Sequence, residues 1–193
     1  MDEQQTVSFD DEPLILVDGD DNIIDHTTKL SAHQGDGQRH RAFSIFLFAQ
    51  DQVLLQQRSA TKPLWPLFWS NSCCSHPRKG ESYETAIHRR LREELALDLP
   101  LHFLYRFEYH ARYRDVGAEH ELCSVYVGKL PAPQTVAVNP LEVAAWQWLD
   151  CTELDARVAA NAPELTPWFV LEWTRLRRDF NDAIVALPAT PPL

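Results

Sequence analysis

The segment that most constrains the fold is residues 42–49 (AFSIFLFA), where apolar residues follow one another almost without interruption. A strand that buries only one face alternates apolar and polar residues, so this run predicts a strand covered on both faces. Residues 53–57 are suited to pair with it across a turn at residues 50–52. The chain is therefore expected to surround at least one strand with packed layers.

Further strands are predicted on both sides of this pair in the sequence. They are expected at residues 14–17, 22–25, 102–113, 121–130 and 145–149. Residues 63–77, between the second hairpin strand and the first long helix, are rich in Trp and Pro and are too irregular for a helix.

Two helices are predicted. The clearest follows Ser82, which suits an N-cap, and its Ile87, Leu91 and Leu95 recur every four residues as a buried stripe. Residues 164–186 predict a second helix. Its inward face is expected to carry Trp168, Leu171, Leu176 and Phe180.

The predicted elements fit a single α+β domain at residues 13–187, a usual size for one domain. Residues 1–12 are acidic and weakly apolar and are expected to form a flexible lead-in, whereas residues 188–193 form a Pro-rich tail. The N-terminus resembles neither a secretory signal nor a transit peptide. No run approaches the roughly 18 to 20 apolar residues that a membrane span requires.

The formal charge of −10 argues against broad attraction to nucleic acid or to anionic lipid. An anion must then be bound by a few basic groups gathered in a pocket, or by a metal. The cysteines, Cys73, Cys74, Cys123 and Cys151, show no C-x-x-C spacing. Free thiols in a reducing cytoplasm are expected, and nothing indicates an obligate protein partner or a membrane.

Histidines and glutamates with suitable spacing indicate a metal site. His33 and His40 lie on either side of a glycine-containing loop, which can fold both imidazoles toward one point. Glu119 and Glu121 are two apart at the start of a strand, so both carboxylates share a face and His120 points away.

With His76, these residues form a set of N and O donors without a thiolate. Such a set suits Mn²⁺, Mg²⁺ or Zn²⁺ in a catalytic site better than a structural zinc. A solvated charge cluster around residues 119–121 is the competing interpretation on spacing alone.

The thiol of Cys74 is predicted to lie beside this metal site, because in an extended chain it points the same way as His76. There it could exchange a proton with a bound substrate, whereas Cys73 is expected to be a small buried hydrophobe. A nucleophilic dyad with His76 as the base is the competing use, although no oxyanion-hole signature accompanies it.

Two Arg-Glu pairs lie four residues apart on the first helix: Arg89 with Glu93, and Arg90 with Glu94. The simplest interpretation is a pair of surface ion pairs. The functional interpretation is that Glu94 holds a divalent cation while Arg90 meets a phosphate. Mg²⁺ between carboxylate and phosphate oxygens would let an acidic protein bind a diphosphate.

Residues 75–97 resemble a Nudix box, G-x5-E-x7-R-E-U-x-E-E-x-G-U, where U is aliphatic. The matching positions are Glu81, Arg89, Leu91, Glu93, Glu94 and Leu97. Ser75 and Ala96 replace the glycines, and Arg90 replaces the glutamate that a Nudix hydrolase uses in metal-assisted attack by water. The replacement by Arg90 argues against hydrolysis.

The surrounding motifs resemble the type I isopentenyl-diphosphate isomerases. They are S-A-H-x6-H-R-A-F-S at residues 31–44, W-P-x2-W-x-N-S-x-C-x-H-P at 65–77, E-x-E-x-C at 119–123 and P-W at 167–168. The resemblance covers roughly residues 14–180 and implies a single Nudix-type domain, with a mixed β-sheet packed between helices.

The resemblance also implies a role for each matching residue. Metal ligands would be His33, His40, His76, Glu119 and Glu121, with Glu94 binding the Mg²⁺ that accompanies the substrate. Proton carriers would be Cys74 and Glu121, assisted by Tyr109, with the aromatic Trp168 facing the hydrocarbon. Diphosphate contacts would be Lys29, Arg58, Lys62 and Arg90.

The implied reaction converts isopentenyl diphosphate to dimethylallyl diphosphate in isoprenoid biosynthesis. An unactivated alkene gains a proton at one carbon and loses one two carbons away, so the site needs an acid and a base. A π-face steadies the developing cation, and water must be excluded. A Nudix pyrophosphohydrolase and a non-catalytic Nudix-fold diphosphate sensor remain the alternatives.

Overall fold

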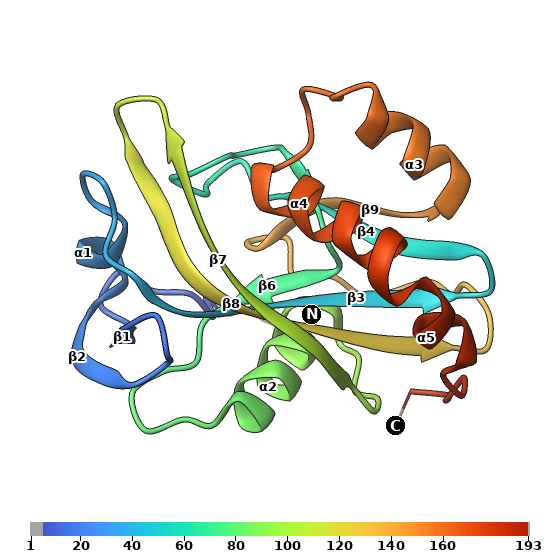
Figure 1. The fold of residues 1–193 in the computed structure, drawn as a ribbon, viewed down its shortest axis with the longest axis horizontal. Helices are drawn as coiled ribbons and strands as arrows, with labels where there is room; N and C mark the ends of the chain where they lie inside the picture. The colour runs from blue at the N-terminus through green and yellow to red at the C-terminus, as the bar shows by residue number, and fades with distance from the viewer. Residues whose placement is uncertain (1–5, 193) are drawn as a thin grey trace.

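The computed structural model describes residues 6–192, and Figure 1 shows its fold. The strands are β1 (Pro13–Val17), β2 (Ile23–Thr28), β3 (His40–Ala49), β4 (Gln52–Arg58), β5 (Trp69–Ser70), β6 (Cys73–Ser75), β7 (His102–Tyr113), β8 (Gly117–Leu130) and β9 (Val143–Asp150). The helices are α1 (Lys29–His33), α2 (Tyr83–Leu95), α3 (Cys151–Ala159), α4 (Pro167–Arg175), the π-helical turn η1 (Leu176–Phe180) and α5 (Asn181–Ala186).

Strand β3 is the centre of a mixed sheet. One edge of β3 pairs in parallel with β8 along its whole length, from His40 opposite Glu121 to Ala49 opposite Leu130. Its other edge pairs in turn with β1, β6 and β4, all antiparallel. Strand β7 continues the sheet beyond β8, and β9 continues it beyond β4, whose other edge pairs first with β3 and then with β5.

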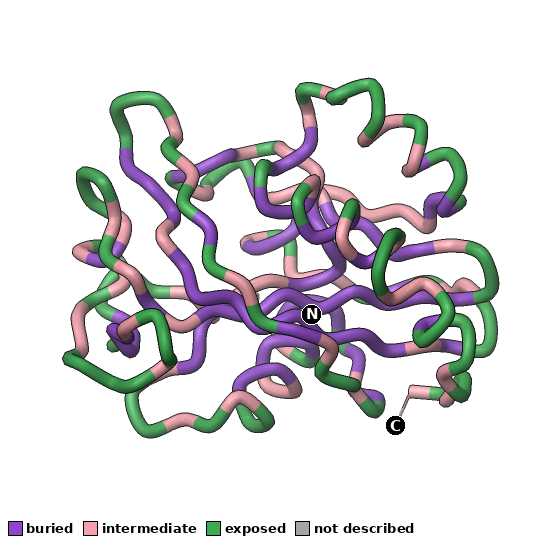
Figure 2. The backbone as a smooth tube through the Cα atoms, in the orientation of Figure 1, coloured by how far each residue is buried: buried purple, intermediate pink, exposed green. Residues whose placement is uncertain are grey.

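The two faces of β3 enter two separate hydrophobic cores, as the uninterrupted apolar run predicted. Phe43, Ile45 and Leu47 pack with the buried stripe of α2, whereas Phe46 and Phe48 pack with α4. Figure 1 shows α2 and α4 on opposite sides of the strand, and Figure 2 shows the buried path of β3 between them. The α+β class and the mixed sheet between helices are confirmed.

Capping residues fix both ends of helix α2. The Ser82 side chain accepts a hydrogen bond from the backbone N–H of Thr85, and Ala96 ends the helix in the left-handed conformation at φ 50°. Ala96 holds the position where the Nudix motif has glycine, the residue that adopts this conformation with least strain.

The second predicted helix is divided into α4, η1 and α5. Trp168, Phe169, Glu172 and Trp173 are the buried residues of α4. The expected inward position of Leu171 is wrong, because it lies on the opposite side of the helix and is 54% exposed. Phe180 stacks on Tyr105, with their ring centroids 5.1 Å apart.

Several short elements were not predicted: α1, β5, β6 and α3. The sequence contains a signal for the start of α3, because Asp150 is its N-cap and accepts hydrogen bonds from the backbone N–H groups of Thr152 and Glu153. Of the lead-in expected to be flexible, residues 1–5 lie outside the described part, and residues 6–12 contact the domain. Within residues 6–192, none of the helices has the length and apolar character needed to cross a bilayer.

The α4 core contact gives a direct test of this packing. Phe169 is fully buried and stacks on Phe46 at 5.9 Å, so Phe169→Ala should lower the free energy of unfolding by about 3–5 kcal/mol. Leu171→Ala on the exposed side of the same helix is the matched control and should change it by less than about 0.5 kcal/mol. Urea unfolding followed by tryptophan fluorescence measures both; equal effects would contradict the assigned helix face.

Candidate functional site

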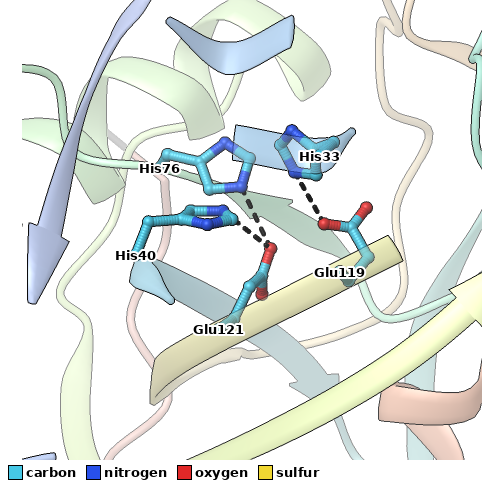
Figure 3. A group of neighbouring side chains, drawn as sticks. All are labelled: His33, His40, His76, Glu119 and Glu121. Carbon is cyan, nitrogen blue, oxygen red and sulfur yellow. Dashed lines mark hydrogen bonds and ion pairs between the residues drawn. The ribbon is translucent and has the colours of Figure 1, made fainter. Parts of the chain in front are cut away.

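Five side chains with metal-binding atoms meet between α1 and the sheet, as Figure 3 shows. His33 ends α1, His40 begins β3, and His76 follows β6. Glu119 and Glu121 project from the same face of β8, since residues two apart on a strand share a face. The parallel register then places His40 directly beside Glu121.

The ligand atoms of these five residues all lie within 4.8 Å of one another. His33 Nε2 is 2.7 Å from a Glu119 oxygen. His76 Nε2 and His40 Nε2 are 3.0 and 3.7 Å from Glu121 Oε1. As expected, His120 points away from the group, and its Nε2 lies 2.9 Å from Glu108 on the surface.

Hydrogen bonds behind two of the histidines fix which ring nitrogen faces the group. Nδ1 of His33 and Nδ1 of His40 each lie 2.7 Å from a backbone carbonyl, that of Lys29 and that of Gln38. A carbonyl only accepts, so each Nδ1 carries a proton, and in the neutral imidazole each Nε2 is the nitrogen available to a cation.

The electron-rich centre fits a divalent cation. His40 Nε2, which faces Glu121, is buried without a hydrogen-bond partner among the described residues. Burial, and then the nearby His33, lower the pKa of His40 to about 3, so its imidazole stays neutral, the state that binds metal. Burial, and then Glu119, raise the pKa of Glu121 well above its usual range, and a cation would relieve that repulsion.

A cavity of about 380 Å³ adjoins this group. Cys74, Tyr109, Glu121 and Trp168 all line it. The Tyr109 hydroxyl donates a 2.7 Å hydrogen bond to Glu121 Oε2, the oxygen that does not face the histidines. Glu121 thus faces His40 and His76 with one oxygen and Tyr109 with the other.

The Cys74 thiol shares the cavity with a guanidinium. Burial raises the pKa of Cys74 to about 12, and Arg58, whose Nη1 lies 3.9 Å from the sulfur, opposes that shift. Arg58 is held by the carbonyls of Leu64 and Trp65, and its charge also lies 5.3 Å above the Trp168 ring. Arg58 is therefore the cation placed to stabilise an ionised thiol.

Trp168 forms an aromatic wall of the cavity. Its indole stacks with Tyr109 at 6.0 Å and meets Trp65 edge-on at 5.2 Å. Trp65 is itself buried in the hydrophobic core, so it serves both as core and as support for Trp168. Trp69, the other tryptophan of that segment, packs against the core.

The remaining predicted basic residues, Lys29, Lys62 and Arg90, also line the cavity. Lys62 and Arg90 both contact Glu142, and Arg90 also donates a 2.5 Å hydrogen bond to Glu94. Glu94 is buried and is not among the residues that line the cavity, and a cation at Glu94 would compete with its contact to Arg90. Lys29 pairs with Glu12 at 3.3 Å.

Some residues in and beside the pocket were not anticipated from the sequence. Glu142 holds Lys62 and Arg90, and although burial opposes it, these two cations lower the pKa of Glu142 to about 2. The Val7 carbonyl accepts from Arg90 Nη1 at 2.9 Å, and Ser8 accepts from Lys29. No spacing signal links these residues to their partners, which are up to 83 positions away.

The sequence of the chain is similar to a known protein family and to proteins with known names. A family model described as the NUDIX domain matches residues 38–169. The chain is 40% identical over 176 residues to "Isopentenyl-diphosphate Delta-isomerase 1" of Photorhabdus laumondii, covering 90% of this chain and 99% of that protein. It is 42% identical over 161 residues to "Isopentenyl-diphosphate Delta-isomerase" of Serratia proteamaculans, covering 83% and 88%.

Among solved structures, the fold is similar to that of DR0079 from Deinococcus radiodurans, with a TM-score of 0.70 and 26% sequence identity. That match covers 86% of this chain and 100% of the other.

Proposed function

The chain belongs to the NUDIX family and, within it, to the isopentenyl-diphosphate Delta-isomerases, and from this premise we propose that it converts isopentenyl diphosphate to dimethylallyl diphosphate. The family resemblance that the motifs indicated is thereby confirmed. The observation that carries the proposal is that Cys74 and Glu121 line one cavity with an aromatic wall and a group able to hold a metal.

The reaction needs one group to add a proton and another to remove one. The alkene electron pair forms a C–H bond at the terminal carbon, and the electrons of a C–H bond two carbons away form the new alkene. We assign the added proton to Glu121 with Tyr109, and the removed proton to Cys74, with the roles exchanged in the reverse direction. Removal by Cys74 requires an ionised thiol, which the neighbouring Arg58 stabilises.

Trp168 and its neighbours protect the cationic intermediate. The face of an indole attracts positive charge, so Trp168 steadies the tertiary centre that forms between the two proton transfers. The buried aromatic wall of Tyr109, Trp65 and Trp168 keeps out water that would trap this cation as an alcohol.

The diphosphate is assigned to Lys29, Arg58, Lys62 and Arg90. Carboxylates already hold Lys62 and Arg90 in place, so little side-chain freedom is lost when the substrate binds. Contacts with the unreactive diphosphate can then position the distant alkene. We assign the substrate-associated Mg²⁺ to Glu94.

The five-residue His/Glu group is assigned a resident divalent cation: Mn²⁺, Mg²⁺ or Zn²⁺. When bound, the cation supplies positive charge that polarises and orients the carboxyl group of Glu121. His33 and His40 keep their Nε2 atoms aimed at that position through their backbone hydrogen bonds.

We also propose that the protein acts in the cytoplasm on a small diphosphate, without nucleic acid or a membrane. The acidic charge of −10 supports this, as do the free thiols of all four cysteines.

Incubation of the purified protein with isopentenyl diphosphate and Mg²⁺ in D₂O tests the function. We expect dimethylallyl diphosphate with deuterium in a methyl group, and no release of phosphate. Release of phosphate or monophosphate without isomerisation would instead support a NUDIX hydrolase, and binding without any turnover would support a sensor.

A further inference from the structure

Glu172 is a fully buried carboxyl group that the proposed mechanism does not use. It lies on α4 with 0% exposure, and no Lys or Arg of the described chain forms a salt bridge with it. Its Oε1 lies 3.5 Å from Cys123 Sγ, and Ser44 hydrogen-bonds to the carboxyl, whereas Oε2 has no partner in the described part. An ionised carboxylate in such surroundings would be strongly destabilising.

The group is therefore neutral in the folded protein at pH 7. Burial raises the pKa of Glu172 to about 8, so the carboxyl carries a proton and can donate a hydrogen bond. The titratable groups facing it are Cys123 from β8 and Tyr105 from β7, whose hydroxyl donates to the Glu172 backbone carbonyl at 3.3 Å. Cys74 and Glu121 are the next ionisable groups, and a negative Glu172 would raise the pKa of each.

The partners of Glu172 lie on β8, which carries Glu121, and on β3, which pairs with the strand that carries Cys74. Ser44 on β3 is the register partner of Cys74 on β6, so their side chains share a face of the sheet. Cys123 follows Glu121 by two residues on β8 and shares that same face. Cys123 Sγ also lies 3.6 Å from Ser44 Oγ, so Glu172, Ser44 and Cys123 form a small polar cluster between α4 and the sheet.

The same helix carries the aromatic wall of the pocket. Trp168 precedes Glu172 by four residues, so both side chains project from one face of α4. A contact that fixes Glu172 on the sheet therefore also fixes the height and rotation of Trp168 above the cavity.

We propose that Glu172, in its protonated form, is a positioning residue that docks α4 onto β3 and β8 and so holds Trp168 in register with Cys74 and Glu121. This inference rests on the proposed isomerase function for its effect on turnover, but the docking itself does not depend on it. Ionisation of Glu172 puts an uncompensated charge between α4 and the sheet, so the position of Trp168 over Cys74 and Glu121 is lost at alkaline pH.

Kinetics of Glu172→Gln and Glu172→Ala between pH 6 and 10 test the catalytic part. Gln keeps the size and the hydrogen bonds without the charge, so kcat at pH 7 should stay within about threefold of the parent protein and should persist above pH 8, where the parent declines. Glu172→Ala should lower kcat at least about tenfold with little change in KM, because the diphosphate contacts lie elsewhere. Glu153→Gln, an exposed carboxyl on α3, is the matched control and should keep the parent profile.

The unfolding temperature, measured as a function of pH, tests the packing of α4 on the sheet without any turnover. The folded pKa lies above the usual value of 4.5, so between pH 4.5 and about 8 the folded state holds a proton that the unfolded state has released. The contribution of protonated Glu172 to the free energy of unfolding is therefore fully present below pH 4.5 and is lost as the pH rises to about 8. Relative to the parent, Glu172→Gln should gain stability over that window.

The two readouts separate the proposals. A parent protein without isomerase activity overturns the proposed function. The difference in unfolding temperature between the parent and Glu172→Gln still tests the packing of α4 on the sheet. Identical pH profiles of stability and kcat for the parent and Glu172→Gln overturn the positioning role. If Glu172→Ala fails to fold, the comparison with Glu172→Gln still decides.

Discussion

Replacement of Cys74 by Ser should lower kcat for isomerisation by about 10²–10⁴-fold, the usual contribution of a group that transfers a proton. Serine keeps the size of the side chain and its place beside Arg58, but its hydroxyl ionises far less readily than a thiol. Glu121→Gln should have an effect at least as large, because the amide can still accept from Tyr109 but cannot exchange a proton with substrate. Both rates are measured by conversion of isopentenyl diphosphate and by deuterium uptake from D₂O.

The adjacent cysteine supplies the control. Cys73 is fully buried in the α2 core, on the opposite face of the sheet from Cys74. Cys73→Ala should therefore keep kcat within about threefold, with a cost of roughly 1 kcal/mol in stability for the lost core volume. A Cys74→Ser protein that turns over and exchanges deuterium at the parent rate would remove Cys74 from the mechanism. Metal content is measured alongside, since Glu121 also belongs to the proposed metal site.

Elements with strong local patterns could be predicted from the sequence. The apolar run of β3 indicated a strand buried on both sides, and the spacing of Ile87, Leu91 and Leu95 indicated the face of α2. Alternation along β8 was enough to put Glu119 and Glu121 on one face. These features depend on neighbours within one strand or helix, where the geometry is regular.

Features that depend on tertiary contacts could not be predicted. Glu142 meets Lys62 across 80 residues of sequence, and Glu172 meets Cys123 across 49. Leu171 was expected inside because it is apolar, but the position of α4 over β3 decides which face is buried. Assignment of the metal group needed the family resemblance as well as spacing, because lone histidines and acidic pairs are common on protein surfaces.

Loss of one side chain from the proposed metal site should also nearly abolish activity. Glu119 faces His33 at 2.7 Å, whereas the Tyr109 hydroxyl bonds to Glu121, so Glu119→Gln should weaken the proposed metal site while keeping the hydrogen bond between Tyr109 and Glu121. Removal of one ligand charge from a site built of three imidazoles and two carboxylates should reduce metal affinity and isomerisation by at least about 100-fold. Activity of the parent should fall to the same level after chelation and return when a divalent cation is added.

The neighbouring histidine distinguishes a metal site from a cluster of polar groups. His120 lies between the two glutamates in sequence but points to the surface, where it pairs with Glu108. His120→Ala should therefore bind metal and turn over like the parent. A cation that binds only the folded state raises the unfolding temperature, so added Mn²⁺ or Zn²⁺ should stabilise the parent and His120→Ala but stabilise Glu119→Gln much less. Equal stabilisation of all three proteins, with equal metal content, would show that the cation binds elsewhere.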